Sequence, residues 1–284
     1  MQEQAASRTA FRVALRRAAH QILDDPRVLD DPIAVPILGM DEEAIVTAAM
    51  RPGEGGYSTR LRAYFVARSR YAEDALATAV ASGVDQYVVL GAGLDTFACR
   101  NPFPALRVFE IDHPATQAWK RERIAASGLT LPASATFVPV DFERQSLEDA
   151  IAVSSFDRAR PAFFSWLGVV PYLTVEAITA TLRFVGAGAI GTGIALDYGQ
   201  PAESVPFTER IALSVLARRV AAAGEPFRSS FTPDAIERIV RDAGFTTIED
   251  IGMDVVNDRY FRGRSDGLSV AGKTGRLLSA WRQS

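Results

Sequence analysis

Short apolar runs and helical periodicities alternate along most of the chain. From Gln86 onward, apolar runs typical of buried parallel strands are separated by segments whose apolar residues recur every three or four positions. The pattern predicts strands at 86–91, 107–112, 136–141, 161–167, 190–197, 245–251 and 276–282, and helices at 114–127, 145–152, 174–185, 205–223 and 232–243. This alternation indicates an α/β fold, with a mostly parallel seven-stranded sheet covered by helices on both faces.

The N-terminal region has a different pattern. An amphipathic helix is predicted over 8–23, and the turn-forming residues that follow it end the pattern. A glycine-containing segment at 51–58 then precedes a long helix over 59–81, and it is either a hinged lid or a plain surface loop. We therefore expect residues 1–58 to form a helical extension over the cofactor cleft and residues 59–284 to form the main domain.

Composition and charge narrow the class of protein. The 284 residues are 48% hydrophobic and 23% charged, as in a globular protein with a substantial core, and the net charge of −3 argues against a general nucleic-acid binder. The helix at 205–223 would serve either as the face of a homodimer or as core. We expect a small-molecule partner.

Few residues are available for metal, disulfide or lysine chemistry. Cys99 is the single cysteine, which rules out an intrachain disulfide and a cysteine cluster, and only Lys120 and Lys273 are lysines. No apolar stretch reaches the length of a membrane span, and the first residues lack an export signal. We expect a cytoplasmic protein without a bound metal.

The segment 86–112 carries the strongest indication of a ligand. An apolar strand ends at Gly91, the turn Gly91-Ala92-Gly93 follows, and a second strand ends at Asp112, 21 residues after Gly91. Glycine in such a turn allows a ligand to approach the backbone, and an acid at this spacing receives the ribose hydroxyls of a bound adenosine. The sequence therefore predicts a nucleotide-type cofactor site.

The turn departs from the dinucleotide fingerprint, because Thr96 stands where that motif has its third glycine. The pyrophosphate cradle is therefore not specified, which suits a cofactor without a pyrophosphate. An ordinary strand-end turn would also account for the two glycines alone. A nicotinamide-dependent oxidoreductase remains the first alternative.

Five motifs together resemble the leucine carboxyl methyltransferase-like family of class I S-adenosylmethionine-dependent methyltransferases, including bacterial members that act on polyketide carboxylates. They are Val66-Ala67-Arg68-Ser69-Arg70, Val89-Leu90-Gly91-Ala92-Gly93-Leu94-Asp95-Thr96, Phe109-Glu110-Ile111-Asp112, Val140-Asp141-Phe142 and Trp166-Leu167-Gly168-Val169-Val170-Pro171-Tyr172-Leu173. The resemblance covers nearly the whole chain and implies a Rossmann-like class I methyltransferase fold.

The resemblance also implies a set of residues that bind S-adenosyl-L-methionine. Arg68 matches the arginine that pairs with the methionine carboxylate, Gly91 and Gly93 match the turn at the methionine part, and Asp112 matches the acid on the ribose. Asp141 and Phe142 match the pair beside adenine.

One position departs from the eukaryotic members of the family, because Leu167 aligns with their glutamate at the end of the fourth strand. The protein-carboxylate substrate of those members is therefore not transferred to this chain. Tyr172 and Tyr198, which follow strands, are candidates for orienting the acceptor, and a core role with a satisfied hydroxyl is the alternative for each.

These observations predict an O-methyltransferase for a carboxylate or another acidic oxygen of a small molecule. A carboxylate acceptor needs no general base, and the two histidines, His20 and His113, are both expected to have other roles. A protein that binds the cofactor without turnover is the further alternative.

Overall fold

A computed structural model describes residues 8–50, 55–141, 145–222, 224 and 226–284. The helices in these residues are α1 Arg8–Leu23, α2 Glu42–Ala49, α3 Gly55–Ala81, α4 Phe97–Arg100, α5 Pro114–Ala126, α6 Leu147–Ala152, α7 Val175–Gly186, α8 Phe207–Ala222, α9 Pro233–Asp242 and α10 Met253–Tyr260. Three short 3₁₀ helices are η1 Pro36–Leu38, η2 Val170–Tyr172 and η3 Ala202–Ser204. The strands are β1 Gln86–Leu90, β2 Arg107–Asp112, β3 Ala135–Pro139, β4 Phe163–Trp166, β5 Gly193–Gly199, β6 Thr247–Gly252 and β7 Gly275–Trp281.

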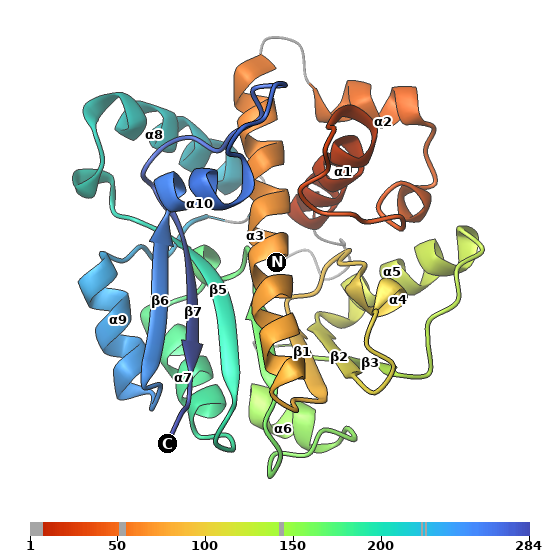
Figure 1. Cartoon of the computed structure of the whole chain (residues 1–284), viewed down its shortest axis with the longest axis vertical. Helices are drawn as coiled ribbons and strands as arrows, with labels where there is room; N and C mark the ends of the chain where they lie inside the picture. Colours follow the sequence, from red (N-terminus) through yellow and green to blue (C-terminus); the bar gives the residue numbers. More distant parts are fainter. Residues whose placement is uncertain (1–7, 51–54, 142–144, 223, 225) are drawn as a thin grey trace. The chain divides into compact units, whose positions relative to one another are not determined.

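The strands form a seven-stranded sheet in the order β3-β2-β1-β4-β5-β7-β6 (Figure 1). Strand β2 pairs in parallel with β3, and β4 pairs in parallel with both β1 and β5. Strand β7 is antiparallel to β5 and to β6. The predicted α/β fold with a mostly parallel seven-stranded sheet is therefore confirmed.

The chain divides into two compact units that each contain several separate segments. Unit 1 consists of residues 1–70, 91–155 and 256–270, and unit 2 consists of residues 71–90, 156–255 and 271–284. Unit 1 contains α1, the turn after β1 and the pair β2–β3. Unit 2 contains β1, β4 and β5 together with the antiparallel strands.

The core of unit 1 joins the N-terminal helices to the helix that follows β2. Small apolar residues of α1 allow close packing against the neighbouring segments. The buried residues of this cluster are Ala14, Leu15, Ala18, Ala19, Ala34, Ile37, Leu38, Ile45, Ala49, Leu94, Ile124 and Phe137. A buried ionic cluster fixes the end of α1 as well. His20 Nδ1 lies 2.7 Å from Asp24 Oδ2, and Arg62 of α3 donates to both oxygens of Asp24 at 2.8 and 2.9 Å.

The core of unit 2 includes a close approach of an aromatic ring to a glycine of the sheet. A Cβ atom on Gly193 of β5 would lie 2.3 Å from the ring of Trp281, which stands opposite it on β7. Only glycine leaves room for that ring, and Trp281 in turn packs on Phe163 of β4, with ring centroids 5.3 Å apart.

The structure corrects several predicted boundaries. Gly55 to Ser58, predicted as part of a glycine loop, instead begin α3, and residues 51–54 lie outside the described part of the chain. Helices α2, α4 and α10 were not predicted. The side chain of Asp41 caps α2 by accepting from Ala44 N, and acids at 42 and 43 occupy its first turn, so this helix had a readable start signal.

Candidate functional site

The glycine turn after β1 is built from backbone that only glycine adopts easily. Gly91 and Gly93 have φ values of 68° and 51°, in the left-handed region. Their N–H groups point to β2: Gly91 N donates to Ile111 O at 2.8 Å, and Gly93 N donates to Asp112 Oδ2 at 2.6 Å. The turn is therefore clamped directly to the end of the neighbouring strand.

Asp112 lies at the carboxyl end of β2, the edge at which parallel sheets bind ligands. Its other oxygen, Oδ1, accepts from His113 N at 2.6 Å. Burial raises the pKa of this carboxyl, although the bonds from Gly93 and His113 and the charge of Lys120 oppose the shift. Each carboxylate oxygen has two acceptor sites, so these single bonds leave acceptor capacity for the hydroxyls of a ribose.

Arg68 belongs to α3 and also to unit 1. It is 7% exposed, and its guanidinium carbon lies 4.8 Å from the ring centroid of Phe65 and 5.7 Å from that of Tyr64. Stacking on aromatic faces fixes the plane of a guanidinium. This is a geometry suited to a carboxylate ligand.

Asp141 follows β3 and is connected to Asp112 through the backbone. Val140 N donates to Asp112 O at 2.9 Å, so the residue before Asp141 is bonded to the predicted ribose acid. Asp141 itself is half-buried, and its carbonyl accepts from Gln145 N. Phe142, its predicted partner beside adenine, lies outside the described residues.

The structure thus brings Gly91, Gly93 and Asp112 together through direct hydrogen bonds and ties Asp141 to them through Val140. Arg68 shares their unit. Gly91, Gly93, Asp112 and Asp141 come from loops and strand ends, where the backbone of a parallel sheet is open to ligands, whereas Arg68 comes from helix α3.

A buried ionic cluster beside the glycine turn was missed by the sequence interpretation. Arg17 of α1 donates to Asp95 Oδ2 at 3.0 Å, to Asp31 Oδ2 at 2.6 Å and to Thr96 Oγ1 at 2.8 Å. Arg100 lies 3.3 Å from Asp31 Oδ1. The charges oppose the effect of burial and lower the pKa of Asp95 to about 2. The available signal was the pair Asp95-Thr96 shortly after the glycine turn, but its partner Arg17 lies 78 residues before Asp95 in the sequence.

A second buried pair joins Glu110 of β2, two residues before Asp112, to Lys120 of α5. Lys120 Nζ lies 2.5 Å from Glu110 Oε2, and both side chains are 1% exposed. Glu110 Oε1 has no hydrogen-bond partner among the described residues. Burial raises the pKa of Glu110 to about 7, with Lys120 acting in the opposite direction. Because residues two apart on a strand share a face, this pair lies on the face of β2 that carries Asp112.

The two tyrosine candidates for the acceptor have different surroundings in unit 2. Tyr198 is 1% exposed and donates its hydroxyl to Asp250 Oδ2 at 2.6 Å, and burial together with Asp250 raises its pKa. This placement favours the core alternative for Tyr198. Tyr172 is half-buried, and its ring centroid lies 5.5 Å from that of Phe227.

The carboxylate of Asp197 lies beside Leu167, the residue that we aligned with the glutamate of the eukaryotic family members. The register of β4 and β5 pairs Trp166 with Leu196, so the next residues, Leu167 and Asp197, are neighbours at the strand ends. Asp197 is 3% exposed and accepts from Gly168 N at 2.5 Å. The acid therefore fixes the start of the loop that leads to Tyr172.

Both histidines have structural roles. His113 is the N-cap of α5, and its Nδ1 accepts from Ala115 N at 3.2 Å. His20 is fully buried, and its Nε2 accepts from Val28 N at 3.0 Å. His20 is therefore enclosed in the core of unit 1, whereas His113 is an exposed N-cap next to Asp112.

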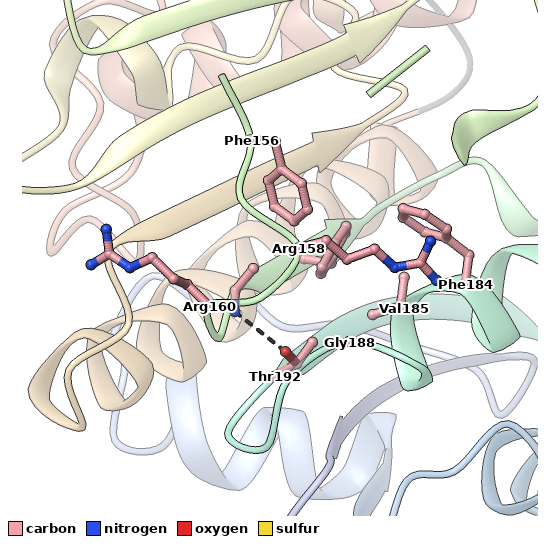
Figure 2. Close-up of a pocket in the computed structure, with 9 residues that line it drawn as sticks. Phe156, Arg158, Arg160, Phe184, Val185, Gly188 and Thr192 are labelled. Carbon is pink, nitrogen blue, oxygen red and sulfur yellow. Dashed lines mark hydrogen bonds between the residues drawn. The ribbon is translucent and has the colours of Figure 1, made fainter. Parts of the chain in front are cut away.

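Figure 2 shows a hollow in unit 2 that does not serve as the ligand site. It is lined by residues that precede β4 and by the α7–β5 connection, with Arg158 stacked 4.6 Å from the centroid of Phe184. The dashed line in Figure 2 is the bond from Ala162 N to Thr192 Oγ1. Its volume of about 10 Å³ holds at most one water molecule. It also lies at the amino ends of the strands, opposite the edge that binds ligands in parallel sheets.

The fold and the clamped glycine turn define a Rossmann-like methyltransferase. The sequence profile of the family described as leucine carboxyl methyltransferase matches residues 10–186. The chain belongs to this family.

Individual relatives agree with that assignment. The chain is 31% identical to the "Putative S-adenosyl-L-methionine-dependent methyltransferase YktD" of Bacillus subtilis, over 95% of this chain and 96% of that protein. A "Putative S-adenosyl-L-methionine-dependent methyltransferase" of Saccharopolyspora erythraea is 35% identical, over 66% of this chain and 66% of that protein.

Solved structures share the fold. A crystal structure described as a "putative methyltransferase" from Thermobifida fusca superposes with a TM-score of 0.58 at 17% identity, and covers 96% of this chain and 94% of that one. A "duf574 family protein" from Streptomyces avermitilis gives a TM-score of 0.52 at 18% identity, covering 95% and 97%.

The described residues contain neither a metal-binding cluster nor a membrane-spanning helix. No group of three or more histidine, cysteine or acidic residues there is placed to hold a metal ion. No helix in the same part of the chain is long and apolar enough to cross a bilayer.

Proposed function

We propose that the protein is an S-adenosyl-L-methionine-dependent O-methyltransferase that methylates a carboxylate or another acidic oxygen of a small molecule, such as a polyketide or another secondary metabolite. The observation that carries the proposal is the bond of Gly93 N to Asp112 Oδ2, at the strand edge expected for a nucleoside, in a chain of the leucine carboxyl methyltransferase family. The names of the bacterial relatives support the choice of cofactor.

The residues present fit this cofactor by the chemistry of their groups. Asp112 supplies acceptors for two ribose hydroxyls, and the stacked guanidinium of Arg68 supplies parallel donors for an amino-acid carboxylate. Gly91 and Gly93 keep side chains away from the turn, so a ligand can lie on the backbone. Asp141 would accept from an exocyclic amine, and Phe142 is assigned to the adenine with it.

The bound cofactor supplies a methyl group on a sulfonium sulfur, which makes the transfer an in-line displacement. The protein then has to position the acceptor, and proximity provides much of the rate. A carboxylate is already nucleophilic when ionised and needs no base, which agrees with the structural roles of both histidines. Tyr172 is the remaining tyrosine candidate for orienting the acceptor.

The N-terminal segment completes the proposal. We assign residues 1–58 as an extension that covers the cofactor cleft, and the contact of Arg17 with Asp95 supports this assignment within unit 1. Residues 51–54, part of the segment predicted to be either a lid or a surface loop, are not among those that the structure describes.

The acceptor class can be tested with cofactor that carries a radiolabelled methyl group. The protein is incubated with a panel of small carboxylic acids, including polyketide acids, and with phenols of similar size. Methyl esters release volatile methanol in alkali, whereas methyl ethers do not. We expect label in alkali-labile product from at least one acid. Label found only in alkali-stable product would replace the carboxylate by a hydroxyl acceptor.

A further inference from the structure

Arg17 connects three separate segments of unit 1 at the glycine turn. Its guanidinium contacts Asp31 from the segment after α1 and both Asp95 and Thr96 from the loop after β1. Thr96 Oγ1 in turn donates to Asp31 Oδ2 at 2.7 Å. One side chain of the N-terminal helix therefore holds the loop that carries the glycines.

The contacts continue from Asp95 into the turn itself. Asp95 N donates to Ala92 O at 2.7 Å, and Asp95 Oδ1 accepts from Phe97 N at 2.8 Å, at the first residue of α4. The backbone of the turn is thus closed by Asp95 on one side and by the bond from Gly93 N to Asp112 on the other. Arg17 bonds the carboxylate of the same residue at Oδ2, so Asp95 is held through both its side chain and its backbone.

The helix that carries Arg17 also contacts the turn directly. A Cβ atom placed on Gly93 would lie 3.0 Å from Cβ of Ala10. The small side chain of Ala10 permits this close approach of α1 to the turn. Ala10 and Arg17 are seven residues apart, two helical turns, so they lie on the same face of α1. This face is therefore seated on the glycine turn at both points.

Burial makes the cluster of Arg17, Asp31, Asp95 and Thr96 sensitive to substitution of any one of its side chains. Asp31 is fully buried, Arg17 and Thr96 are 4% and 2% exposed, and the Asp95 side chain is 20% exposed. Arg17 and Arg100 balance the charges of Asp31 and Asp95. A guanidinium can bond two acids at once in a fixed plane, whereas an ammonium cannot reproduce that geometry.

We propose that Arg17 is a positioning residue for cofactor binding, which acts through Asp95 and Thr96 to hold the turn Gly91–Gly93 in the conformation that receives the methionine part of S-adenosyl-L-methionine. This inference rests on the proposed function. A turn that is held before binding loses less conformational entropy when the ligand arrives, so loosening it weakens affinity without removing a ligand contact. Through Arg17, the N-terminal helix then contributes to cofactor binding, although Arg17 itself does not touch the cofactor.

The test is a calorimetric titration with S-adenosylhomocysteine of the wild type, Arg17→Lys, Asp95→Asn and the double variant. Lysine keeps the charge and reaches one acid only. We expect the dissociation constant to rise about 10-fold for Arg17→Lys and about 5-fold for Asp95→Asn. The double variant should be no weaker than Arg17→Lys alone, because the two residues act through one contact.

Arg62→Lys is the matched control. Arg62 is 5% exposed, lies in the same unit and bonds both oxygens of Asp24, but it has no contact with the turn residues in the bonds described above. We expect its affinity to stay within twofold of the wild type even where its melting temperature falls as far as that of Arg17→Lys. Equal weakening in the control would show that Arg17 only stabilises unit 1 and would overturn the inference.

Amide hydrogen exchange at residues 91–97 supplies a readout that does not depend on ligand. Arg17→Lys should speed exchange there, and Arg62→Lys should not. Unchanged exchange in Arg17→Lys would overturn the inference even if affinity falls. Failure of the wild type to bind S-adenosylhomocysteine, with faster exchange at 91–97 in Arg17→Lys, would instead overturn the proposed function and leave the mechanical link intact.

Discussion

The strand ends of the two units are built in different ways. In unit 1, the turn after β1 consists of glycines with positive φ whose N–H groups are bonded to β2, and charged side chains surround it. In unit 2, the ends of β4 and β5 carry Tyr198, whose hydroxyl is bonded to Asp250, and the half-buried ring pair Tyr172–Phe227. Polar contacts fix the turn in the first region, whereas the second region presents a half-buried aromatic pair beside the polar contacts of Asp197 and Asp250.

The difference is what a methyltransferase with a constant cofactor and a variable acceptor requires. Backbone donors and buried ion pairs specify a geometry closely, because changing any one of them leaves a polar group unsatisfied. Aromatic surface tolerates substitution better, since a similar volume can be packed in several ways. The comparison predicts that changes in unit 1 affect cofactor binding and that changes near Tyr172 affect the choice of acceptor.

The largest expected effect is that of Gly93→Ala. A non-glycine residue at this φ is strained, and the new methyl group would press on Ala10, so we expect a loss of roughly 2–3 kcal/mol in the free energy of unfolding. Urea denaturation measures it. Adding Ala10→Gly should recover part of the loss, and Ala10→Gly alone is the control. Strict additivity of the two changes would show that α1 does not press on the turn.

The next prediction is a pH dependence of stability that comes from one carboxyl of unit 1. The folded pKa of Glu110 is about 7, above its ordinary 4.5, so the protonated form is favoured in the folded state. Its contribution to stability is complete below about pH 4.5 and is lost as the pH rises through about 7, at about 1 kcal/mol per pH unit. Asp95, with a pKa of about 2, does not titrate in this window.

Glu110→Gln should remove this slope. Urea denaturation of both proteins at several values between pH 4.5 and 7 gives the difference in the free energy of unfolding, in which contributions common to both proteins cancel. A difference that stays constant across the window would contradict the raised pKa of Glu110.

The smallest expected effect is that of Tyr198→Phe in unit 2. Removing the hydroxyl leaves Asp250 with Arg276, which bonds it at 2.9 Å, so we expect a loss of about 1 kcal/mol in stability. Affinity for S-adenosylhomocysteine and turnover of the acceptor should not change. A fall in kcat/KM for the acceptor, with stability unchanged, would return Tyr198 to the acceptor site. Tyr172→Phe is the matched comparison.

The same contrast explains how far the sequence could be interpreted. Strands β1 and β2 were predicted to within one residue, because a continuous apolar run ends at Gly91 and a mostly apolar one ends at Asp112, and the spacing of these two residues indicated the cofactor site. The cluster around Arg17 could not be predicted, since it joins segments 14 and 78 residues apart that come together only in the folded chain. Tyr198 likewise depends on Asp250, 52 residues further on, so its burial could not be distinguished from exposure at a strand end.

The most direct test of the central claim is a thermal-shift titration of the wild type and Asp112→Asn with S-adenosylhomocysteine, NAD and NADP. A ligand that binds only the folded protein raises the melting temperature. We predict that S-adenosylhomocysteine alone stabilises the wild type and that Asp112→Asn, which still unfolds cooperatively, loses the response. Stabilisation by a nicotinamide cofactor alone, or an undiminished response of Asp112→Asn to S-adenosylhomocysteine, would contradict the account.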